Sequence, residues 1–271
     1  MNKEYIYNLF SLDNKVILIT GGYGLLGKQF SKALAAAGAK VVIGGRDYEK
    51  ALSVAEQIGG WAVEIDVSKR ESVDLAVQNV AKKFGVINGL INNASYSSPA
   101  DNKGDNFTPF EDFSETAWKR SLDVDVTGMF FCAQHVGKLM VENGGGVILN
   151  ISSVYGINSP DPRIYKNIVN SEGSTFTKPA SYCVAKSAIL NLTRYLAIYW
   201  REKNIRVNTL TLGGVSDGQN KSFVDAYSER TPLSRMANPD EYNGSVLFLL
   251  SDASSYMTGA NLVVDGGWTA W

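Results

Sequence analysis

The chain has 271 residues, 45% of them hydrophobic and 20% charged, so we expect a folded α/β protein with a sizeable core. Lysine and arginine (26) balance aspartate and glutamate (27), and the formal net charge of −1 excludes the basic excess that non-specific nucleic-acid binding requires. Two cysteines and one histidine exclude a disulfide framework and a multi-histidine site, so we expect no bound metal. With no signal peptide and no membrane-spanning run, the sequence predicts a cytoplasmic protein without membrane contact.

Short apolar runs alternate along the chain with longer mixed segments. The predicted strands are 16–19, 41–43, 61–65, 90–91, 147–149, 207–210 and 262–264. Helical patterns follow most of them, for example at 28–37 and 68–84. Strands that are apolar on both faces and alternate with helices predict a doubly wound parallel sheet of seven strands in a single domain, residues 1–271. Residues 157–180 contain three prolines and only weak periodicity, so we expect an inserted loop there.

A glycine-rich turn, residues 20–27, joins the first strand to the first helix. Its glycines Gly21, Gly24 and Gly27 recur every third residue, which permits a tight turn and a close approach of the backbone to a pyrophosphate. The helix that follows would direct free N–H groups and a positive dipole end at the phosphates. The turn therefore predicts a dinucleotide site, and the alternative is a plain tight turn.

The end of the second strand bears on the choice of cofactor. An acidic residue there accepts a hydrogen bond from the adenosine 2′-hydroxyl, but this chain has Gly45, followed by Arg46. A guanidinium without a carboxylate favours a 2′-phosphate, so we predict NADP(H). In the alternative, Arg46 stacks on the adenine or Asp47 takes the acidic role, and NAD(H) binds. Asp66, with Val67 after the third strand, is a candidate for binding the adenine amine, or else a local helix cap.

Tyr182 and Lys186 lie four residues apart on a segment with a helical pattern, so they share one helix face. The ammonium favours the phenolate form, which suits the phenol to general acid–base work. A chance surface pair is the alternative. However, Asn93 and Ser153 follow or end apolar strands, and the carboxyl edge of such a sheet is where ligands bind. The four side chains together predict a reacting site.

These segments together resemble the short-chain dehydrogenase/reductase family over essentially the whole chain except 157–180. The matching pieces are 20–27, 66–67, 92–94, Ser153, Tyr182 with Lys186, 207–208, 213–215, 248–249, 258–259 and 264–267. The resemblance implies a three-layer Rossmann fold in which Tyr182 is the acid/base, Lys186 binds the nicotinamide ribose and Ser153 orients the reacting oxygen of the substrate. It implies that the cofactor contacts are Gly21, Tyr23, Gly24, Leu25, Leu26, Gly27, Arg46, Asp66, Val67, Asn93, Ala94, Tyr182, Lys186, Gly213 and Val215.

Two departures from the family pattern lie near the reacting site. Where the family has a helix asparagine thought to hold a proton-relay water, this chain has Asp125. We hypothesise that Asp125 is a catalytic member of the relay, although its negative charge opposes the phenolate that Lys186 favours. The segment between Ser153 and Tyr182 is also longer than is usual in the family.

Residues 157–180 lie between two site residues, so we expect them to border the substrate, with Arg163 as a contact for a substrate phosphate or carboxylate. The alternative is a solvated loop whose charges face water. Residues 216–234 match the family's mobile substrate lid and are polar, which favours a hydroxylated, sugar-like substrate. Residues 228–241 and 267–271 resemble a bacterial subgroup associated with flagellin modification and nonulosonic-acid sugars. The family resemblance also implies a homo-oligomer, a dimer or tetramer.

The sequence therefore predicts an NAD(P)(H)-dependent oxidoreductase that interconverts a secondary alcohol and a carbonyl. Two alternatives are a dinucleotide-binding sensor without turnover and a non-redox lyase or epimerase on the same fold. The intact set of Ser153, Tyr182 and Lys186 disfavours the sensor. Retained cofactor without net oxidation would mark the lyase or epimerase.

Overall fold

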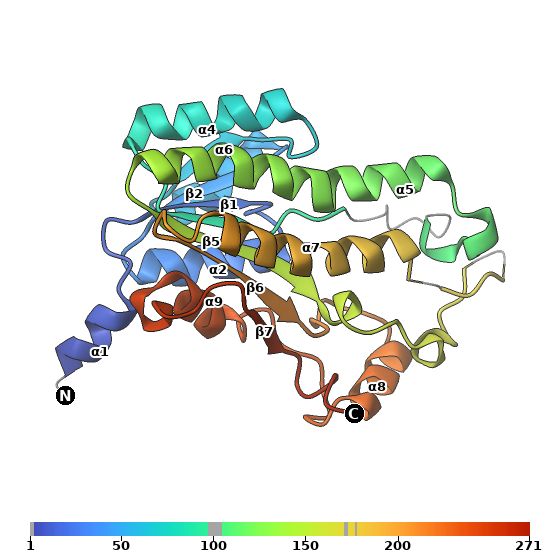
Figure 1. Cartoon of the computed structure of the whole chain (residues 1–271). Coiled ribbons are helices and arrows are strands. Elements are labelled where there is room, and N and C mark those ends of the chain that lie inside the picture. Colours follow the sequence, from blue (N-terminus) through green and yellow to red (C-terminus); the bar gives the residue numbers. More distant parts are fainter. Residues whose placement is uncertain (1–2, 97–104, 171–172, 177) are drawn as a thin grey trace.

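The computed structural model describes residues 3–96, 105–170, 173–176 and 178–271 (Figure 1). Its centre is a seven-stranded sheet in the order β3-β2-β1-β4-β5-β6-β7, and all neighbouring strands are parallel. The strands are β1 (Val16–Thr20), β2 (Lys40–Gly45), β3 (Trp61–Glu64), β4 (Gly89–Asn92), β5 (Gly146–Ser153), β6 (Ile205–Leu212) and β7 (Asn261–Val264). The predicted sheet is confirmed. The strand order reverses between β1 and β4, and open α/β sheets bind ligands at the carboxyl edge of such a point.

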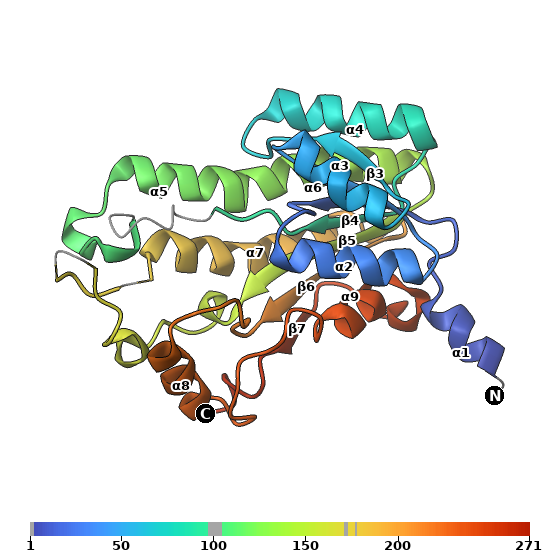
Figure 2. The ribbon, with the colours of Figure 1, turned by 180° about the vertical axis from the view of Figure 1, so that it is seen from behind.

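Helices cover both faces of the sheet (Figures 1 and 2). One layer contains α4 (Arg70–Phe84), α6 (Gly128–Glu142) and α7 (Ala180–Tyr199), and the other contains α2 (Leu25–Ala36), α3 (Tyr48–Gln57) and α9 (Asn243–Leu250). A π-helical turn (Asp123–Thr127) joins α5 (Glu115–Leu122) to α6 in one long helix. The short helix α1 (Lys3–Phe10), which the sequence analysis did not predict, projects from the body. Within the described part of the chain, no helix is long and apolar enough to cross a membrane.

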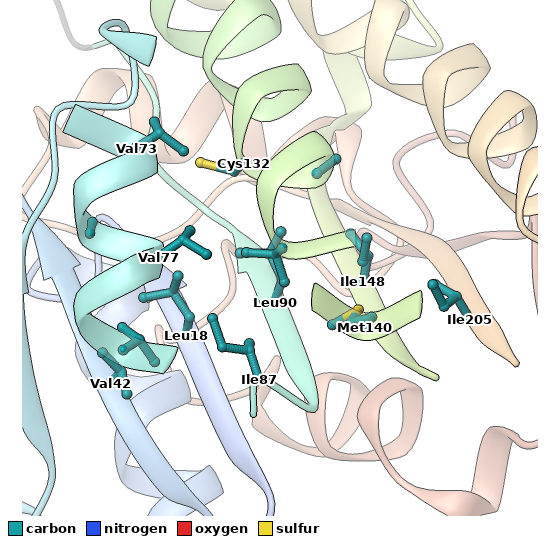
Figure 3. Close-up of a cluster of buried hydrophobic side chains, with 14 of the residues drawn as sticks. Leu18, Val42, Val73, Val77, Ile87, Leu90, Cys132, Met140, Ile148 and Ile205 are labelled. Atoms are coloured by element: carbon teal, nitrogen blue, oxygen red, sulfur yellow. The ribbon is translucent and has the colours of Figure 1, made fainter. Parts of the chain in front are cut away.

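The core between the sheet and the α4–α6 layer fixes the strands that end at the carboxyl edge (Figure 3). The strand side chains Leu18, Val42, Leu90 and Ile148 pack in one cluster with Val73 and Val77 of α4 and Cys132 and Met140 of α6. Burying an aliphatic side chain of this size contributes about 1.5–3 kcal/mol relative to leaving it exposed. The strand ends that reach the site are therefore held by a densely packed, rigid layer.

Some element boundaries differ from the predicted ones. Helix α4 begins at Arg70 rather than at residue 68, because the Ser68 hydroxyl donates to Asp66 (2.7 Å) instead of capping the helix. Helix α2 begins at Leu25 rather than at residue 28, so the last three residues of the predicted glycine turn form the start of the helix. Strand β5 continues through Ser153, and so it places this serine at the carboxyl edge of the sheet.

Three separate segments lie together beyond this edge: the described residues of 157–180, helix α8 (Lys221–Arg230) and residues 265–271. We call them the cap. The described part of the predicted insertion contains a short 3-10 turn (Pro162–Tyr165) and an isolated antiparallel bridge. The Tyr165 ring stacks on Phe223 of α8 with their centres 5.5 Å apart. Helix α8 falls within the predicted lid, 216–234, so insertion and lid pack against one another.

Candidate active site

The glycine turn closes against the loop that follows β4. The Asn93 side-chain amide donates to the carbonyl oxygens of Thr20 and Gly21, both at 3.1 Å. The backbone N–H groups of Asn93 and Ala94 donate to the Thr20 hydroxyl, also at 3.1 Å. Gly21 has φ of +63°, and a Cβ there would lie 3.0 Å from the Ala94 Cα. Only glycine fits this turn without strain.

The remaining glycines of the turn fit a pyrophosphate cradle. Gly24 is the N-cap of α2 and offers no side chain to the N–H groups of the first helical turn. A Cβ on Gly27 would lie 2.7 Å from the Gly22 Cα, so a glycine here lets α2 pack directly on the turn. The first turn, which begins with Leu25 and Leu26, thus presents backbone N–H groups at a positive helix end. These groups suit the phosphates of a dinucleotide.

The end of β2 is shaped by Gly45. Tyr23 packs so closely onto this glycine that any Cβ would clash with its ring, which excludes a carboxylate while Tyr23 stays in place. Arg46 is exposed beside it. Asp47 accepts a hydrogen bond from the Lys50 N–H (3.1 Å) and pairs with the Lys50 ammonium (2.9 Å), and these contacts hold the pKa of Asp47 below its usual value. Asp47 is therefore engaged locally, and Arg46 stays exposed at the end of β2.

Asp66 forms a turn of its own after β3. One carboxylate oxygen accepts from the Ser68 hydroxyl (2.7 Å) and N–H (3.1 Å), and the other lies 3.5 Å from the Lys69 ammonium. The structure thus contains the local turn that the sequence left as an alternative, and the adenine contact of Asp66 stays a prediction. Val67 is buried and lies against Gly128 at the start of α6.

A cavity of about 540 Å³ lies at the carboxyl ends of β5 and β6. Ser153 at the end of β5 lines it, together with Tyr182 and Lys186 from α7. Its lining also includes the predicted cofactor residues Leu26, Asn93, Gly213 and Val215. The structure therefore brings the reacting residues into one space with part of the dinucleotide site.

The two serines at the end of β5 have different partners. Ser152 is buried and its hydroxyl donates to the backbone oxygen of Lys186 (2.8 Å), which ties α7 to β5. The Ser153 oxygen accepts from the Tyr155 N–H (3.2 Å), so its own O–H proton is available to another acceptor. Ser153 is the serine whose hydroxyl can donate to a substrate oxygen.

A buried ion pair lies behind Tyr182. The Asp125 carboxylate, 0% exposed and in the π-helical turn, is 3.1 Å from the ammonium of Lys186, which is 4% exposed. The same carboxylate accepts hydrogen bonds from the Ser95 hydroxyl and, at 2.8 Å, from the Tyr96 N–H. The ammonium lies 5.6 Å from the centre of the Tyr182 ring. Asp125 thus reaches Lys186 by direct contact, and π-helical turns of this kind are frequent at functional sites.

Arg163, predicted to contact a substrate anion, does not line the cavity. Asp161 begins the 3-10 turn two residues earlier, and the Arg163 guanidinium donates to it at 2.7 and 3.0 Å while the side chain remains 73% exposed. Arg230 of α8 pairs with the same carboxylate and lies 5.0 Å from the Trp268 ring centre. The hydrogen bonds from Arg163 hold the pKa of Asp161 well below its usual range. Asp161 therefore joins the insertion to α8, and Arg230 in turn contacts the segment 265–271 through Trp268.

The cavity is also lined by residues in or next to the cap for which the sequence predicted no role. The hydroxyls of Tyr155 and Tyr165 lie 2.7 Å apart, and burial raises the pKa of both phenols, so they stay protonated. The ammonium of Lys178 lies 4.0 Å from the centre of the Tyr182 ring. Lys178 precedes Tyr182 by four residues, the spacing that also separates Tyr182 from Lys186. Because Pro179 interrupts the helical pattern at this point, the sequence did not reveal the spacing of Lys178 and Tyr182.

Known proteins resemble this chain along nearly its whole length. A family model described as enoyl-(acyl carrier protein) reductase matches residues 25–269. A D-threitol dehydrogenase from Mycolicibacterium smegmatis is 32% identical over 270 residues, 96% of this chain and 95% of that protein. A galactitol 2-dehydrogenase from Rhizobium johnstonii is 33% identical over 276 residues, 97% of this chain and 98% of that protein. The crystal structure of a gluconate 5-dehydrogenase from Burkholderia cenocepacia in complex with NADP and tartrate aligns with a TM-score of 0.85 at 29% identity, over 98% of this chain and 99% of that one.

Proposed function

Because the chain belongs to the short-chain dehydrogenase/reductase family and is an oxidoreductase acting on CH–OH groups, we propose that it interconverts a secondary alcohol and a carbonyl on a polyol or sugar-like substrate. The observation that supports this most is the shared cavity of Ser153, Tyr182 and Lys186 at the sheet edge. The buried hydroxyl pair of Tyr155 and Tyr165 in the same cavity suits a substrate that carries several hydroxyl groups.

In the proposed reaction, Tyr182 transfers the proton of the substrate hydroxyl and Ser153 binds the oxygen of the same group. During oxidation, Tyr182 accepts the hydroxyl proton while Ser153 donates a hydrogen bond to the same oxygen, and during reduction Tyr182 returns the proton. When bound, a nicotinamide dinucleotide supplies the acceptor or donor of the hydride at the reacting carbon. General acid–base help of this kind contributes about 10²–10⁴ in rate. A pre-placed donor to a developing oxyanion contributes about 10²–10³.

We assign Asp125 a positioning role. A buried ammonium without a partner is strongly destabilising, and Asp125 supplies that partner for Lys186. It also fixes the ammonium beside Tyr182, because the Ser95 hydroxyl and the Tyr96 N–H hold the carboxylate in turn. Asp125 thus acts on Tyr182 through the position of the Lys186 ammonium, which lies 5.6 Å from the centre of the phenol ring.

For the cofactor we propose NADP(H) as the preferred dinucleotide. The glycine turn at 20–27 and the first turn of α2 would hold the pyrophosphate, and Arg46 would bind the 2′-phosphate. Gly45 with Tyr23 packed onto it leaves no carboxylate to repel that phosphate. Binding of NAD(H) remains the alternative, and the ratio of kcat/KM for the two cofactors decides between them.

The proposed function is tested with a panel of polyols, ketoses, sugar phosphates and nucleotide-linked sugars, each with NADP(H) and NAD(H). Nicotinamide absorbance reports turnover, and Tyr182→Phe is the control. Turnover that this variant abolishes supports the proposal. Tight cofactor binding without turnover of any compound would favour the sensor. Conversion of substrate with no net change in the cofactor would favour a lyase or epimerase.

The panel includes acidic and nucleotide-linked sugars for a specific reason. Residues 228–241 and 267–271, which resemble the nonulosonic-acid subgroup, lie at or beside the cap, where Trp271 donates to the backbone oxygen of Arg230 (3.2 Å). We propose such sugars as a narrower substrate class, and turnover confined to neutral polyols would contradict it.

We further propose that the protein forms a homodimer or tetramer through the outer face of α6 and α7. Large apolar side chains are exposed there, with Tyr195 63%, Ile198 68% and Tyr199 63% accessible. Tyr195 and Tyr199 border a mainly apolar groove between α4, α6 and α7. Light scattering on wild type and on Ile198→Lys tests this, and a monomeric wild type would contradict it. The cytoplasmic location, which two unpaired cysteines among the described residues support, also remains a proposal.

A further inference from the structure

We propose that the substrate carries an anionic group, a carboxylate or a phosphate ester, and that Lys178 binds this group close to the reacting carbon. The proposal rests on the proposed function and names the substrate class of the same cavity. The observation behind it is an ammonium that the fold places in the cavity with no carboxylate partner among the described residues.

Contacts made by the residues before and after Lys178 in the chain hold this lysine at the cavity. On one side, the Phe176 N–H donates to the Ile168 oxygen (2.8 Å), and the Phe176 ring packs on Tyr165 with their centres 4.8 Å apart. On the other side, Pro179 begins α7 and its oxygen accepts from the Tyr182 N–H (3.1 Å). The half-buried Lys178 side chain therefore extends over the Tyr182 ring, where the ammonium lies 4.0 Å from the ring centre.

The charges around the cavity leave Lys178 uncompensated. Among the described residues that line the cavity, Lys178 and Lys186 are the charged ones, and none is acidic. Lys186 is paired with Asp125. The two arginines of the cap, Arg163 and Arg230, are both bound to Asp161. In the described part of the chain, the partner of the Lys178 ammonium is the face of the Tyr182 ring, which leaves its three N–H donors for a ligand.

This arrangement favours an anion over a neutral polyol. A half-buried cation loses part of its hydration, and a charge-assisted hydrogen bond to an oxyanion restores it more fully than a hydroxyl does. The neutral hydroxyls of Ser153, Tyr155 and Tyr165 then remain for the alcohol groups of the substrate. The expected substrate is therefore a polyhydroxylated chain with an oxyanion, such as a sugar acid and its keto acid.

The position of the ammonium also limits the position of the anion. A cation over the Tyr182 ring face is close to the phenol oxygen, where the reacting oxygen binds. With hydrogen bonds of about 3 Å at each end, the anionic group lies on the order of two or three carbons from the reacting carbon. A carboxylate at the far end of a long chain would not reach Lys178.

The test compares substrates that differ only in charge. Matched pairs are D-sorbitol with D-gluconate and galactitol with D-galactonate, and D-sorbitol 6-phosphate forms a third arm. Each is assayed with wild type, Lys178→Gln, Lys178→Arg and the control Lys166→Gln, which removes an exposed lysine of the same segment outside the cavity. We expect Lys178→Gln to lower kcat/KM for the acid relative to its polyol by about 10- to 100-fold, chiefly through KM. Lys178→Arg retains most of the preference, and Lys166→Gln leaves it unchanged.

The outcomes separate this inference from the proposed function. If wild type turns over the polyols better than every matched acid or phosphate, Lys178 does not select the substrate, while the proposed function stands. If Lys178→Gln lowers kcat/KM for the acid and for the polyol by the same factor, the lysine acts on Tyr182 and the inference fails. If wild type turns over nothing, the proposed function fails, and the thermal shift caused by D-gluconate in wild type and in Lys178→Gln still decides the inference. An equal shift in both contradicts it. Preference for the phosphate arm identifies the anion as a phosphate ester.

Discussion

The reacting edge of the sheet and the cap meet at the same cavity but are built in different ways. At the edge, regular elements fix the side chains, since Ser153 ends a strand and Lys186 lies on a helix that hydrogen bonds to that strand. In the cap, side chains are held by contacts between segments that are distant in the sequence, such as the ion pair of Asp161 and Arg230. Rigid elements suit groups that perform chemistry, whereas joined loops can vary to suit a substrate. We therefore expect substitutions of the reacting residues at the edge to change kcat and cap substitutions to change the KM of the substrate.

The largest contrast is expected within the edge itself, between two adjacent serines. Ser153→Ala removes the donor to the substrate oxygen and should lower kcat about 10²- to 10³-fold. Ser152→Ala removes a hydrogen bond between β5 and α7 and should cost about 1 kcal/mol of stability with a much smaller loss of rate. Steady-state kinetics and urea unfolding of both variants measure this. Equal rate losses would show that the two hydroxyls are not functionally distinct.

Asp125→Asn should affect stability and pH dependence together. The substitution leaves the Lys186 ammonium buried without its carboxylate, which should lower the free energy of unfolding by about 3 kcal/mol. With the opposing negative charge removed, the phenolate of Tyr182 is favoured, and the pH of half-maximal alcohol oxidation should fall. Urea unfolding and a pH–rate profile report the two effects. An unchanged profile would reject any role of Asp125 in the proton chemistry.

Arg46→Ala tests the cofactor end of the edge. Loss of the guanidinium should lower kcat/KM for NADP(H) relative to NAD(H) by about 10- to 100-fold, mainly through the KM of the cofactor. Lys32→Ala, which removes an exposed lysine on the outer side of α2, serves as the control. A ratio that stays constant in Arg46→Ala would favour the reading in which this arginine stacks on the adenine.

The smallest effect is expected from the contact that joins the cap. The pKa of Asp161 is lowered in the folded protein, so the contact contributes stability above the unfolded value of about 4 and loses it as the pH falls below that value. Stability should therefore fall below about pH 4 in wild type but not in Asp161→Asn, and this variant should raise the substrate KM several-fold at neutral pH with little change in kcat. Steady-state kinetics at neutral pH and urea unfolding of both proteins from neutral pH to below about pH 4 test this. A loss confined to kcat would place Asp161 with the edge residues.

The same contrast explains which features the sequence could predict. The strands, the glycine turn and the pair of Tyr182 and Lys186 follow from local patterns, because periodicity and glycine spacing are set within a few residues. Arg163 binds Asp161 outside the cavity, and its substrate contact stays a prediction. Local pattern could not decide this, because Asp161 also pairs with Arg230 of α8, far along the chain. Lys178 received no role for a local reason, since Pro179 precedes α7 and interrupts the helical pattern that would have related Lys178 to Tyr182.

The central claim, hydride exchange at the reacting edge, is tested most directly with a substrate from the polyol and sugar-acid panel that carries deuterium on the reacting carbon. Wild-type enzyme is incubated with this substrate and oxidised cofactor, and the cofactor is analysed by mass spectrometry. We predict one deuterium on the reduced nicotinamide for each carbonyl formed, and none with Tyr182→Phe. Deuterium that is lost to water, or that stays on a converted product while the cofactor remains unlabelled, would contradict an oxidoreductase and favour a lyase or epimerase.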